Sequence, residues 1–371
     1  MVQQSSVSCP EVNQLSITTT STPPTRKGGR SRRVRLAVLV LKRLGFFAVA
    51  IFSVLSISFL LIALAPGDPA RVIAGSLATA EQIDAIRADL GLDQPIPTRY
   101  FDYITGIFTG DLGTSYFSRQ PVITEIADRL PSTLELVLLS VGVAIVIGVI
   151  LGTIGGYFRG RWPESGSRGI ASALQAIPDF FFALLLILIF FFYLDWAPAP
   201  SGQLDILITP PEQVTGFVPI DSLIAGDLEA FNNALAHLVL PVLTLGLVYA
   251  GYFAKITRSA LAESMQSQQV QFARASGLSE WRTLRYGLVQ IRSSILTYAG
   301  IIFASLFGGA AVVETIFSWN GMGQWALDGI LRLDIPVIQG FVLVAGIITL
   351  LIYTLLDIVV AWLDPRISYG N

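Results

Sequence analysis

The chain has 371 residues, of which 53% are hydrophobic and only 13% charged, and its formal net charge is −2. This composition excludes an ordinary soluble domain and indicates an integral membrane protein. One cysteine, Cys9, and one histidine, His237, leave no disulfide framework and no cysteine-based metal site, and they nearly rule out histidine-based zinc sites and catalytic triads.

Six apolar segments are long enough to cross a membrane as helices, since a span needs about 20 mainly apolar residues at a rise of about 1.5 Å each. All six are too long and too continuous to be the strands of a barrel. The sequence therefore predicts an all-α polytopic membrane protein with six transmembrane helices. These lie at residues 38–65, 134–157, 170–194, 238–256, 295–316 and 340–362.

The distribution of lysine and arginine predicts the orientation, because basic residues favour cytoplasmic loops. Eighteen of the 24 fall on the side that carries both ends of the chain, so both termini are predicted to be cytoplasmic. Residues 1–34, rich in Ser and Thr and without a cleavable signal, are predicted to be a disordered tail on that side. The eighteen are Arg26, Lys27, Arg30, Arg32, Arg33, Arg35, Lys42, Arg43, Arg159, Arg161, Arg168, Lys255, Arg258, Arg274, Arg282, Arg285, Arg292 and Arg366.

The first span, residues 35–65, is followed by an extracytoplasmic segment, residues 66–131, with helical signals. Thr79 and Gln82 fit a capping box at the start of a helix, which a glycine at position 91 should stop. The segment is therefore predicted to be a small helical lid. Its further helices are expected near residues 98–109 and 122–130.

The second outer loop, residues 195–236, is rich in Pro and Gly and is predicted to be irregular apart from one short helix near residues 221–231. Pro178 and Pro241 lie early in the third and fourth spans, where each is expected to kink its helix. Small residues crowd the fifth span at 304–311, which allows close helix approach or leaves room for a passage. No repeat relates the two halves, which counts against an inverted-repeat secondary transporter.

Four acidic residues fall inside predicted spans, where ionisable groups are costly and usually functional. Ser132 and Glu135 form a capping-box pattern, so Glu135 is predicted to serve the start of the second span. Asp357 lies near the inner boundary and is predicted to be interfacial. For the other two acidic residues, Asp179 and Glu314, three roles remain open: lining a passage, bonding across the helix bundle, or contacting substrate amines. The candidate passage-lining residues are Asp179, Glu314, Gly308 and Gly309.

A polar stretch between the fourth and fifth spans, QVQFARASGLSEWRTLRYGLVQIR at residues 269–292, has helical spacing on both sides of a glycine. Gly277 supplies the positive φ that a sharp helix–helix elbow requires. Two interpretations remain open: a docking surface for a soluble partner, or an amphipathic helix on the inner leaflet. The side chains expected to let a partner approach are Phe272, Ala273 and Ser276, and those expected to share one face of the second helix are Trp281, Leu284 and Leu288.

Long motifs are spread over nearly the whole chain. They are LAPGDPA (64–70), LGLDQPIP (90–97), GDLGTS (110–115), PVITEIADRLPSTLEL (121–136), WAPAPSG (196–202), LPVLTLGL (240–247), FARASGLSEWRTL (272–284), GGAAVVETIFSWNGMG (308–323) and LDPRISYG (363–370). In this order they resemble the membrane subunits of binding-protein-dependent ABC importers of type I, specifically the dipeptide/oligopeptide/nickel permeases. Two positions depart from that family, which commonly has a His and an Asn where this chain has Tyr286 and Gln290.

The resemblance implies a role for the elbow and a set of partners. In this family the corresponding loop, here within residues 258–292 of a five-helix permease core at 132–371, inserts into a cleft on an ATPase subunit. The implied partners are a second homologous permease, two cytoplasmic ATPase subunits and an extracytoplasmic solute-binding protein, beside membrane lipid. The residues that the resemblance assigns to ATPase coupling are Phe272, Ala273, Arg274, Ala275, Ser276, Gly277, Leu278, Glu280 and Trp281.

The chain carries no recognisable nucleotide site, because a phosphate-binding loop needs a Gly-Lys pair and none of Lys27, Lys42 and Lys255 follows a glycine. It is therefore predicted to be a transport subunit and not an enzyme, binding no cofactor, metal or nucleic acid, with ATP and Mg on the partner ATPases. The resemblance implies an ATP-driven importer of short peptides (di-/oligopeptides) that works by alternating access in the plasma (inner) membrane of a bacterium. The alternatives are an ion-coupled secondary transporter of a small polar solute and an importer of nickel chelates.

Overall fold

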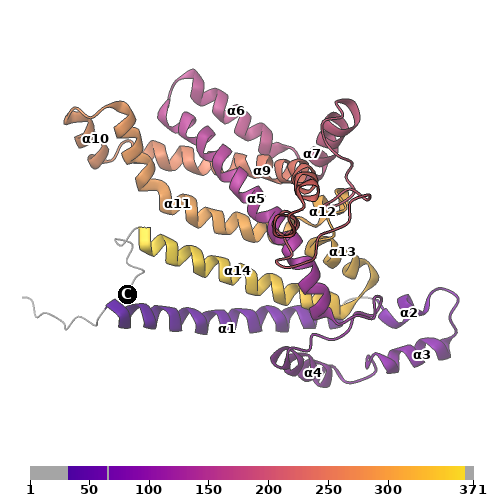
Figure 1. The fold of residues 1–371 in the computed structure, drawn as a ribbon. Helices are drawn as coiled ribbons and strands as arrows, with labels where there is room; N and C mark the ends of the chain where they lie inside the picture. Colours follow the sequence, from indigo (N-terminus) through magenta and orange to yellow (C-terminus); the bar gives the residue numbers. More distant parts are fainter. Residues whose placement is uncertain (1–31, 65–66, 364–371) are drawn as a thin grey trace, which may run out of the picture. The chain divides into compact units, whose positions relative to one another are not determined.

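The computed structural model describes residues 32–64 and 67–363, and within these ranges it contains helices, one isolated β-bridge and no strand (Figure 1). The predicted all-α class is confirmed. Most of the predicted tail, residues 1–31, lies outside the described residues, and α1 (Arg32–Leu64) begins directly after it. Residues from Val49 onward form one compact unit, to which all contacts described below belong.

Five helices among the described residues are long and apolar enough to cross a membrane. A consecutive pair of shorter helical segments meets the same test together and is bent by 97°. Counted as one span, this pair brings the total to the six that the sequence predicts. The five are α1 from Gly45, α5 (Val122–Tyr157), α9 (Leu228–Ser264), α11 (Glu280–Gly309) and α14 (Ile335–Leu363), and the bent pair is α6 (Trp162–Ala176) with α7 (Asp179–Leu186) and its continuation, the π-helix η1 (Ile187–Tyr193).

The 97° bend falls at Pro178, where the sequence predicts a kink. Proline has no amide hydrogen and keeps the residue before it out of the helical region. Ile177 is accordingly extended, with φ −87° and ψ 124°, and Pro178 becomes the N-cap of α7. At Pro241, by contrast, α9 continues without a break.

Helix α5 is longer than predicted, because the expected outer helix at 122–130 and the second span are one helix that runs through Pro131. The prediction that Ser132 and Glu135 form a capping box is therefore wrong, since both lie inside this helix and both are buried. The Ser132 hydroxyl donates to Gln203 Oε1 at 3.3 Å, and Gln203 Nε2 donates to Glu135 Oε2 at 3.4 Å. Glu135 thus connects α5 to the second outer loop.

Helix α11 also differs from the prediction. It begins inside the expected elbow and ends at Gly309, so the second helix of the elbow and the fifth span are one continuous helix. The expected end of that span forms instead the short α12 (Ala311–Ile316), which precedes α13 (Met322–Arg332). The elbow is therefore directly continuous with a spanning helix.

The segment between α1 and α5 is helical, as predicted. The capping box is confirmed: Gln82 N donates to Thr79 Oγ1 at 3.4 Å, and Thr79 N donates to Gln82 Oε1 at 2.9 Å. In the second outer loop the short helix α8 (Val218–Ala225) ends at Gly226, earlier than expected. The helices between α1 and α5 are α2 (Pro69–Ala74), α3 (Ala80–Asp89) and α4 (Ile96–Thr109).

Helices α5 and α9 pack together through glycines of α5. A Cβ atom added to Gly148 would lie 2.3 Å from Phe253 Cβ, and one added to Gly152 would lie 2.5 Å from Thr257 Cβ. Carbon atoms do not approach this closely, so only glycine lets the two backbones meet here. The main apolar core of the bundle includes the buried side chains of Leu136, Val137, Leu245, Phe303 and Phe307.

Replacing Gly152 by leucine is expected to separate α5 from α9, because the new Cβ would also meet Ala254 O at 2.7 Å. Overpacking a core typically costs about 1–3 kcal/mol. We expect the apparent Tm of the purified protein to fall by several degrees. The control is Gly142→Leu, on the same helix but with no atom within 4 Å of the added Cβ. Equal Tm values for the two variants would contradict the close contact.

Candidate functional site

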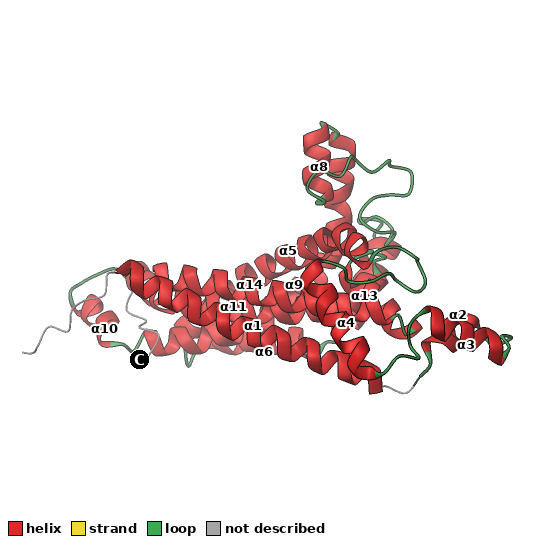
Figure 2. Cartoon of the chain, turned by 90° about the horizontal axis from the view of Figure 1, so that it is seen from below, coloured by secondary structure: helices red, strands yellow, loops and turns green. Residues whose placement is uncertain are grey.

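The elbow, residues 265–280, connects two spanning helices through a separate short helix (Figure 2). After α9 ends at Ser264, Ser267 caps α10 (Gln268–Ala275), and its hydroxyl accepts from Val270 N at 3.4 Å. Helix α11 then starts at Glu280. The predicted helix–Gly–helix arrangement is therefore present.

Gly277 forms the corner of the elbow. Its φ is +78°, and it stands just beyond the last turn of α10. Gly277 N donates to Arg274 O at 3.0 Å, and Leu278 N donates to Ala273 O at 3.2 Å. This pair of hydrogen bonds is a Schellman motif, which requires a left-handed residue at the position of the glycine. The backbone conformation alone therefore explains why a glycine stands at position 277.

The inner face of α10 packs on its own chain. Val270 is fully buried, and Ala273, which the sequence assigns to partner contact, is buried as well. A separate small apolar cluster joins α9 to α11 and consists of Leu261, Leu284 and Ile291. The face of α10 that carries Val270 and Ala273 is therefore covered by this chain and is closed to a partner.

Polar contacts brace the corner. Arg274 Nε donates to Glu280 Oε1 at 3.1 Å and Arg274 Nη2 to Glu280 Oε2 at 3.0 Å, which is a two-point ion pair across Gly277. Tyr157, at the end of α5, donates its hydroxyl to Glu280 Oε2 at 3.0 Å. The pair is exposed, so its contribution to stability is small. Its geometry nevertheless joins α10, α11 and α5 at one point.

Gln290, one of the two departures from the family pattern, has a structural role. Its Oε1 accepts from the hydroxyls of Ser264 at 2.8 Å and Ser267 at 3.2 Å, so it joins α11 to the end of α9 and to the cap of α10. Tyr286, the other departure, is exposed. Although the family commonly has another residue at position 290, the glutamine of this chain makes polar contacts there.

Replacing Gln290 by methionine is expected to loosen α10 without changing the fold, because the two serine hydroxyls lose their shared acceptor. A net hydrogen bond is worth about 1 kcal/mol, so amide exchange in α10 should accelerate roughly fivefold. Hydrogen exchange measured by mass spectrometry tests this. The control is Val289→Met, since Val289 is the exposed neighbour on the same helix. Unchanged exchange in the first variant would show that Gln290 does not hold α10.

The outer face of the elbow exposes two large aromatic side chains. Phe272 is 74% exposed and Trp281 is 73% exposed, one on each side of Gly277. Exposed apolar side chains grouped at one site indicate contact with a partner or with lipid. The remaining assigned residues are exposed, apart from the half-buried Leu278: Arg274, Ala275, Ser276, Gly277 and Glu280.

Asp179 lies at the bend of the third span. It is the first residue of α7, half-buried, and its Oδ1 accepts from Phe180 N at 2.8 Å. The carboxylate therefore bonds to the backbone of the first turn of α7, and part of its surface stays accessible. A passage-lining role for Asp179 remains a prediction.

Glu314 is fully buried and bonds across the helix bundle. Its Oε1 accepts from Thr133 Oγ1 of α5 at 2.6 Å, and its Oε2 accepts from Gln324 N in the first turn of α13 at 2.8 Å. Thr133 Oγ1 in turn accepts from Met322 N at 2.7 Å. A Cβ on Gly321 would lie 2.5 Å from Glu314 Oε1, so the glycine makes room for the carboxyl group. Of the roles considered for Glu314, the structure shows bonding between α12, α5 and α13.

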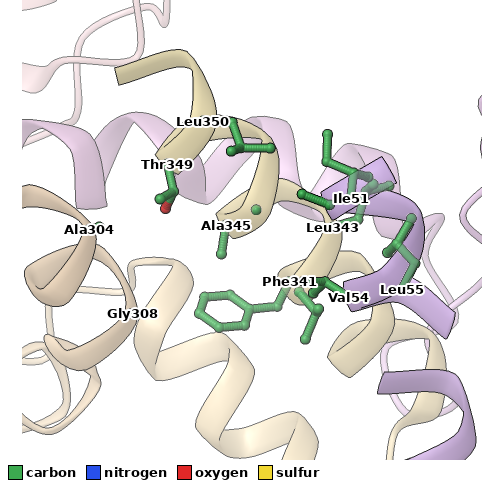
Figure 3. Close-up of a pocket in the computed structure, with 13 residues that line it drawn as sticks. Ile51, Val54, Leu55, Ala304, Gly308, Phe341, Leu343, Ala345, Thr349 and Leu350 are labelled. Carbon is green, nitrogen blue, oxygen red and sulfur yellow. The ribbon is translucent and has the colours of Figure 1, made fainter. Parts of the chain in front are cut away.

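Gly308 and Gly309, the other candidate passage-lining residues, are both exposed at the end of α11. Gly308 lines a cavity of about 370 Å³ together with residues of α1 and α14 (Figure 3). The wall of this cavity is apolar apart from the hydroxyl of Thr349. The structure thus gives Gly308 an apolar environment and does not bring it together with Asp179 or Glu314.

Two family models match the chain. A model described as the binding-protein-dependent transport system inner membrane component matches residues 144–369, and the N-terminal model of the same component matches residues 36–137. The chain belongs to this family. This inner-membrane component is a multi-pass protein of the bacterial inner membrane, and the family resemblance seen in its motifs is confirmed. Its predicted orientation, with both termini in the cytoplasm, is not tested by these matches.

Curated relatives of this inner-membrane component match it over nearly their full length. The probable D,D-dipeptide transport system permease protein DdpB of Escherichia coli (strain K12) is 38% identical over 316 residues, 85% of this chain and 93% of that protein. The di/tripeptide transport system permease protein DppB of Pseudomonas aeruginosa (strain UCBPP-PA14) is 36% identical over 332 residues, 89% of this chain and 98% of that protein. A solved structure of the methionine ABC transporter MetNI in inward-facing conformations has a TM-score of 0.49 and 18% identity, and the match covers 65% of this chain and 97% of that chain.

Proposed function

We propose that this chain is the transmembrane permease subunit of an ATP-driven importer of short peptides. The observation that carries the proposal is the braced elbow, which continues into a spanning helix. Support for the substrate class comes from relatives at 38% and 36% identity whose names specify D,D-dipeptides and di/tripeptides. Transport proceeds by alternating access, in which partner proteins shift the balance between two conformations.

The elbow is the proposed contact with a cytoplasmic ATPase subunit. Phe272 and Trp281 supply exposed aromatic anchors of the kind that dominate protein interfaces. Ala275 and Ser276 lie between them in the sequence, and their small exposed side chains allow a partner to approach closely. Only residues 276–279 separate α10 from Glu280, the first residue of α11, so a displacement of α10 is passed into a spanning helix through a short connection. The two-point ion pair between Arg274 and Glu280 spans this connection and links α10 to the start of that helix.

The chain makes no covalent change in this proposal. Two ATPase subunits bind and hydrolyse ATP with Mg, a second homologous permease completes the passage, and an extracytoplasmic binding protein delivers the peptide. Asp179, half-buried at the bend of the third span, is the proposed polar residue of the passage. The proposed layout is a cytoplasmic tail at 1–34, a first span at 35–65, an extracytoplasmic segment at 66–131 and a permease core at 132–371.

Uptake of a labelled dipeptide and a labelled tripeptide into cells that express this chain with the adjoining transport genes tests the proposal. We expect uptake of at least one peptide, and we expect it to disappear when the partner ATPase carries an inactivating substitution at its catalytic glutamate. Uptake that survives this substitution and follows an ion gradient would replace the proposal by a secondary transporter. Uptake of nickel chelates without peptide uptake would support the proposed ATP-driven mechanism but would replace short peptides by nickel chelates as the substrate.

A further inference from the structure

Two cavities lie along the seam between α1 and α14, away from the elbow. One cavity, of about 370 Å³, is formed mainly by α1 from Ala50 to Leu55 and by α14 from Phe341 to Leu350 (Figure 3). We call it the deeper cavity because it lies farther from the end of α1 and from the start of α14. The second cavity, of about 490 Å³, continues along the same two helices. There it is lined by Leu61 and Ile62 near the end of α1 and by Ile335 and Ile338 at the start of α14. We call this pair of cavities the α1–α14 seam.

The length of the seam matches one leaflet of a bilayer. Ala50 and Ile62 are twelve residues apart on α1, which corresponds to about 18 Å along a helix axis. Half of the hydrocarbon core is about 15 Å thick. The two cavities together therefore extend from the end of the spanning helices to the middle of the membrane.

The polarity of the seam changes along its length. In the deeper cavity the only side chain with a polar atom is Thr349. The second cavity adds Asp68, Arg87 and Arg99 to its apolar wall. Arg87 is paired with two carboxylates, Asp68 at 2.6 Å and Asp84, whereas no carboxylate of the described residues lies within ion-pair distance of Arg99. The seam thus has an apolar inner part and, at its outer end, an arginine that forms no ion pair with a carboxylate of the described residues.

Helix α4 holds Arg99 at the boundary of the membrane. The hydroxyl groups of Tyr100 and Ser56 are 2.7 Å apart, and the ring of Phe59 lies 5.2 Å from that of Tyr100. Ser56 precedes the end of α1 by eight residues, about 12 Å, so α4 packs against the side of a spanning helix. On the free side of α4, Phe101 is 68% exposed, as expected for a helix at the lipid surface. Arg99 lines the second cavity together with Leu61, Ile62 and Ala63, the last residues of α1 but one, which places it near the headgroup level.

We propose that the α1–α14 seam binds one anionic phospholipid, with its phosphate on Arg99 and one acyl chain in the deeper cavity. Guanidinium groups bind phosphate through two parallel hydrogen bonds, which suits a half-buried arginine without a carboxylate partner. A helix of a second permease is the alternative occupant of the seam. From its outer end inward, the seam presents first a cation and then an apolar wall, which matches the phosphate and the acyl chain of a phospholipid.

The test uses the transporter complex in nanodiscs that contain phosphatidylglycerol with a photoreactive acyl chain. We expect one bound lipid per permease by native mass spectrometry, and cross-links on α14 between Phe341 and Leu350. Arg99→Gln should weaken retention of the lipid at least about tenfold, the scale of a lost hydrogen bond to a charged group. Gly346→Leu should abolish the cross-links, because Gly346 lines the deeper cavity and has free space at its Cβ. Lipid binding is read without uptake, so failure here is distinguishable from failure of the proposed transport function.

Matched controls separate the site from general effects. Arg71→Gln removes an exposed arginine that does not line the seam, and Gly142→Leu adds a leucine to a spanning helix elsewhere. Both should retain the lipid as the wild type does. Equal labelling in all variants would overturn the proposal, as would cross-links from the seam to a second permease chain. Displacement of the probe by inorganic phosphate alone would show a free-anion site and would also overturn the lipid assignment.

Discussion

Valine in place of Gly277 is expected to lower ATP-dependent uptake roughly tenfold or more while membrane insertion is unchanged. Gly277 has φ +78°, and no atom lies within 4 Å of a Cβ added to it, so the cost is conformational and not steric. A β-branched residue in the left-handed region costs about 1–3 kcal/mol, and about 1.4 kcal/mol is a factor of ten in an equilibrium. The hydrogen bond from Leu278 N to Ala273 O depends on this conformation. The recovery of the ATPase with the tagged permease, together with peptide uptake, measures the effect.

Two further variants isolate the elbow. Gly226 ends α8 with φ +73° and also has no atom within 4 Å of an added Cβ, so Gly226→Val creates the same backbone strain far from the elbow in the sequence. It should keep ATPase recovery near the wild-type value. Gly277→Asn should retain much of the function, because asparagine tolerates the left-handed conformation. Wild-type ATPase recovery and uptake by Gly277→Val would refute the coupling role of the elbow.

The features that the sequence predicted best depend on residues a few positions apart. The corner at Gly277, the capping box of Thr79 with Gln82 and the break at Pro178 are each set by local backbone chemistry. Proline fixes its own φ, and glycine reaches positive φ, whatever surrounds them. Such features are therefore visible in a single sequence.

The features that the sequence missed depend on packing between distant segments. Pro131 ends no helix, because a helix held by its neighbours tolerates the loss of one hydrogen bond. Spacing alone could not decide which face of α10 turns inward, since the burial of Val270 and Ala273 depends on the rest of the folded chain. The partners of Glu314 were equally hidden, because Thr133 precedes it by 181 residues.

Alanine in place of Glu314 is expected to destabilise the permease itself. The substitution removes the acceptor of Thr133 Oγ1 and of Gln324 N in an environment where Glu314 has no exposed surface. A buried donor without a partner costs about 1–3 kcal/mol, so the total loss is expected to be about 3 kcal/mol or more. The start of α13 should loosen from α5, and the apparent Tm should fall by roughly 5 °C, as thermal unfolding in detergent would show.

A double-mutant cycle decides whether Glu314 acts through Thr133. Thr133→Val should destabilise the protein by less than Glu314→Ala, and the double variant should lose less than the sum, because the two side chains share one hydrogen bond. Glu314→Gln retains one acceptor oxygen and should recover part of the Tm. If Glu314 instead serves the passage, Glu314→Gln should change uptake at an unchanged Tm and show no coupling to Thr133. That result would show that the protein needs the Glu314 carboxyl group for transport and not for its contacts with Thr133 and Gln324.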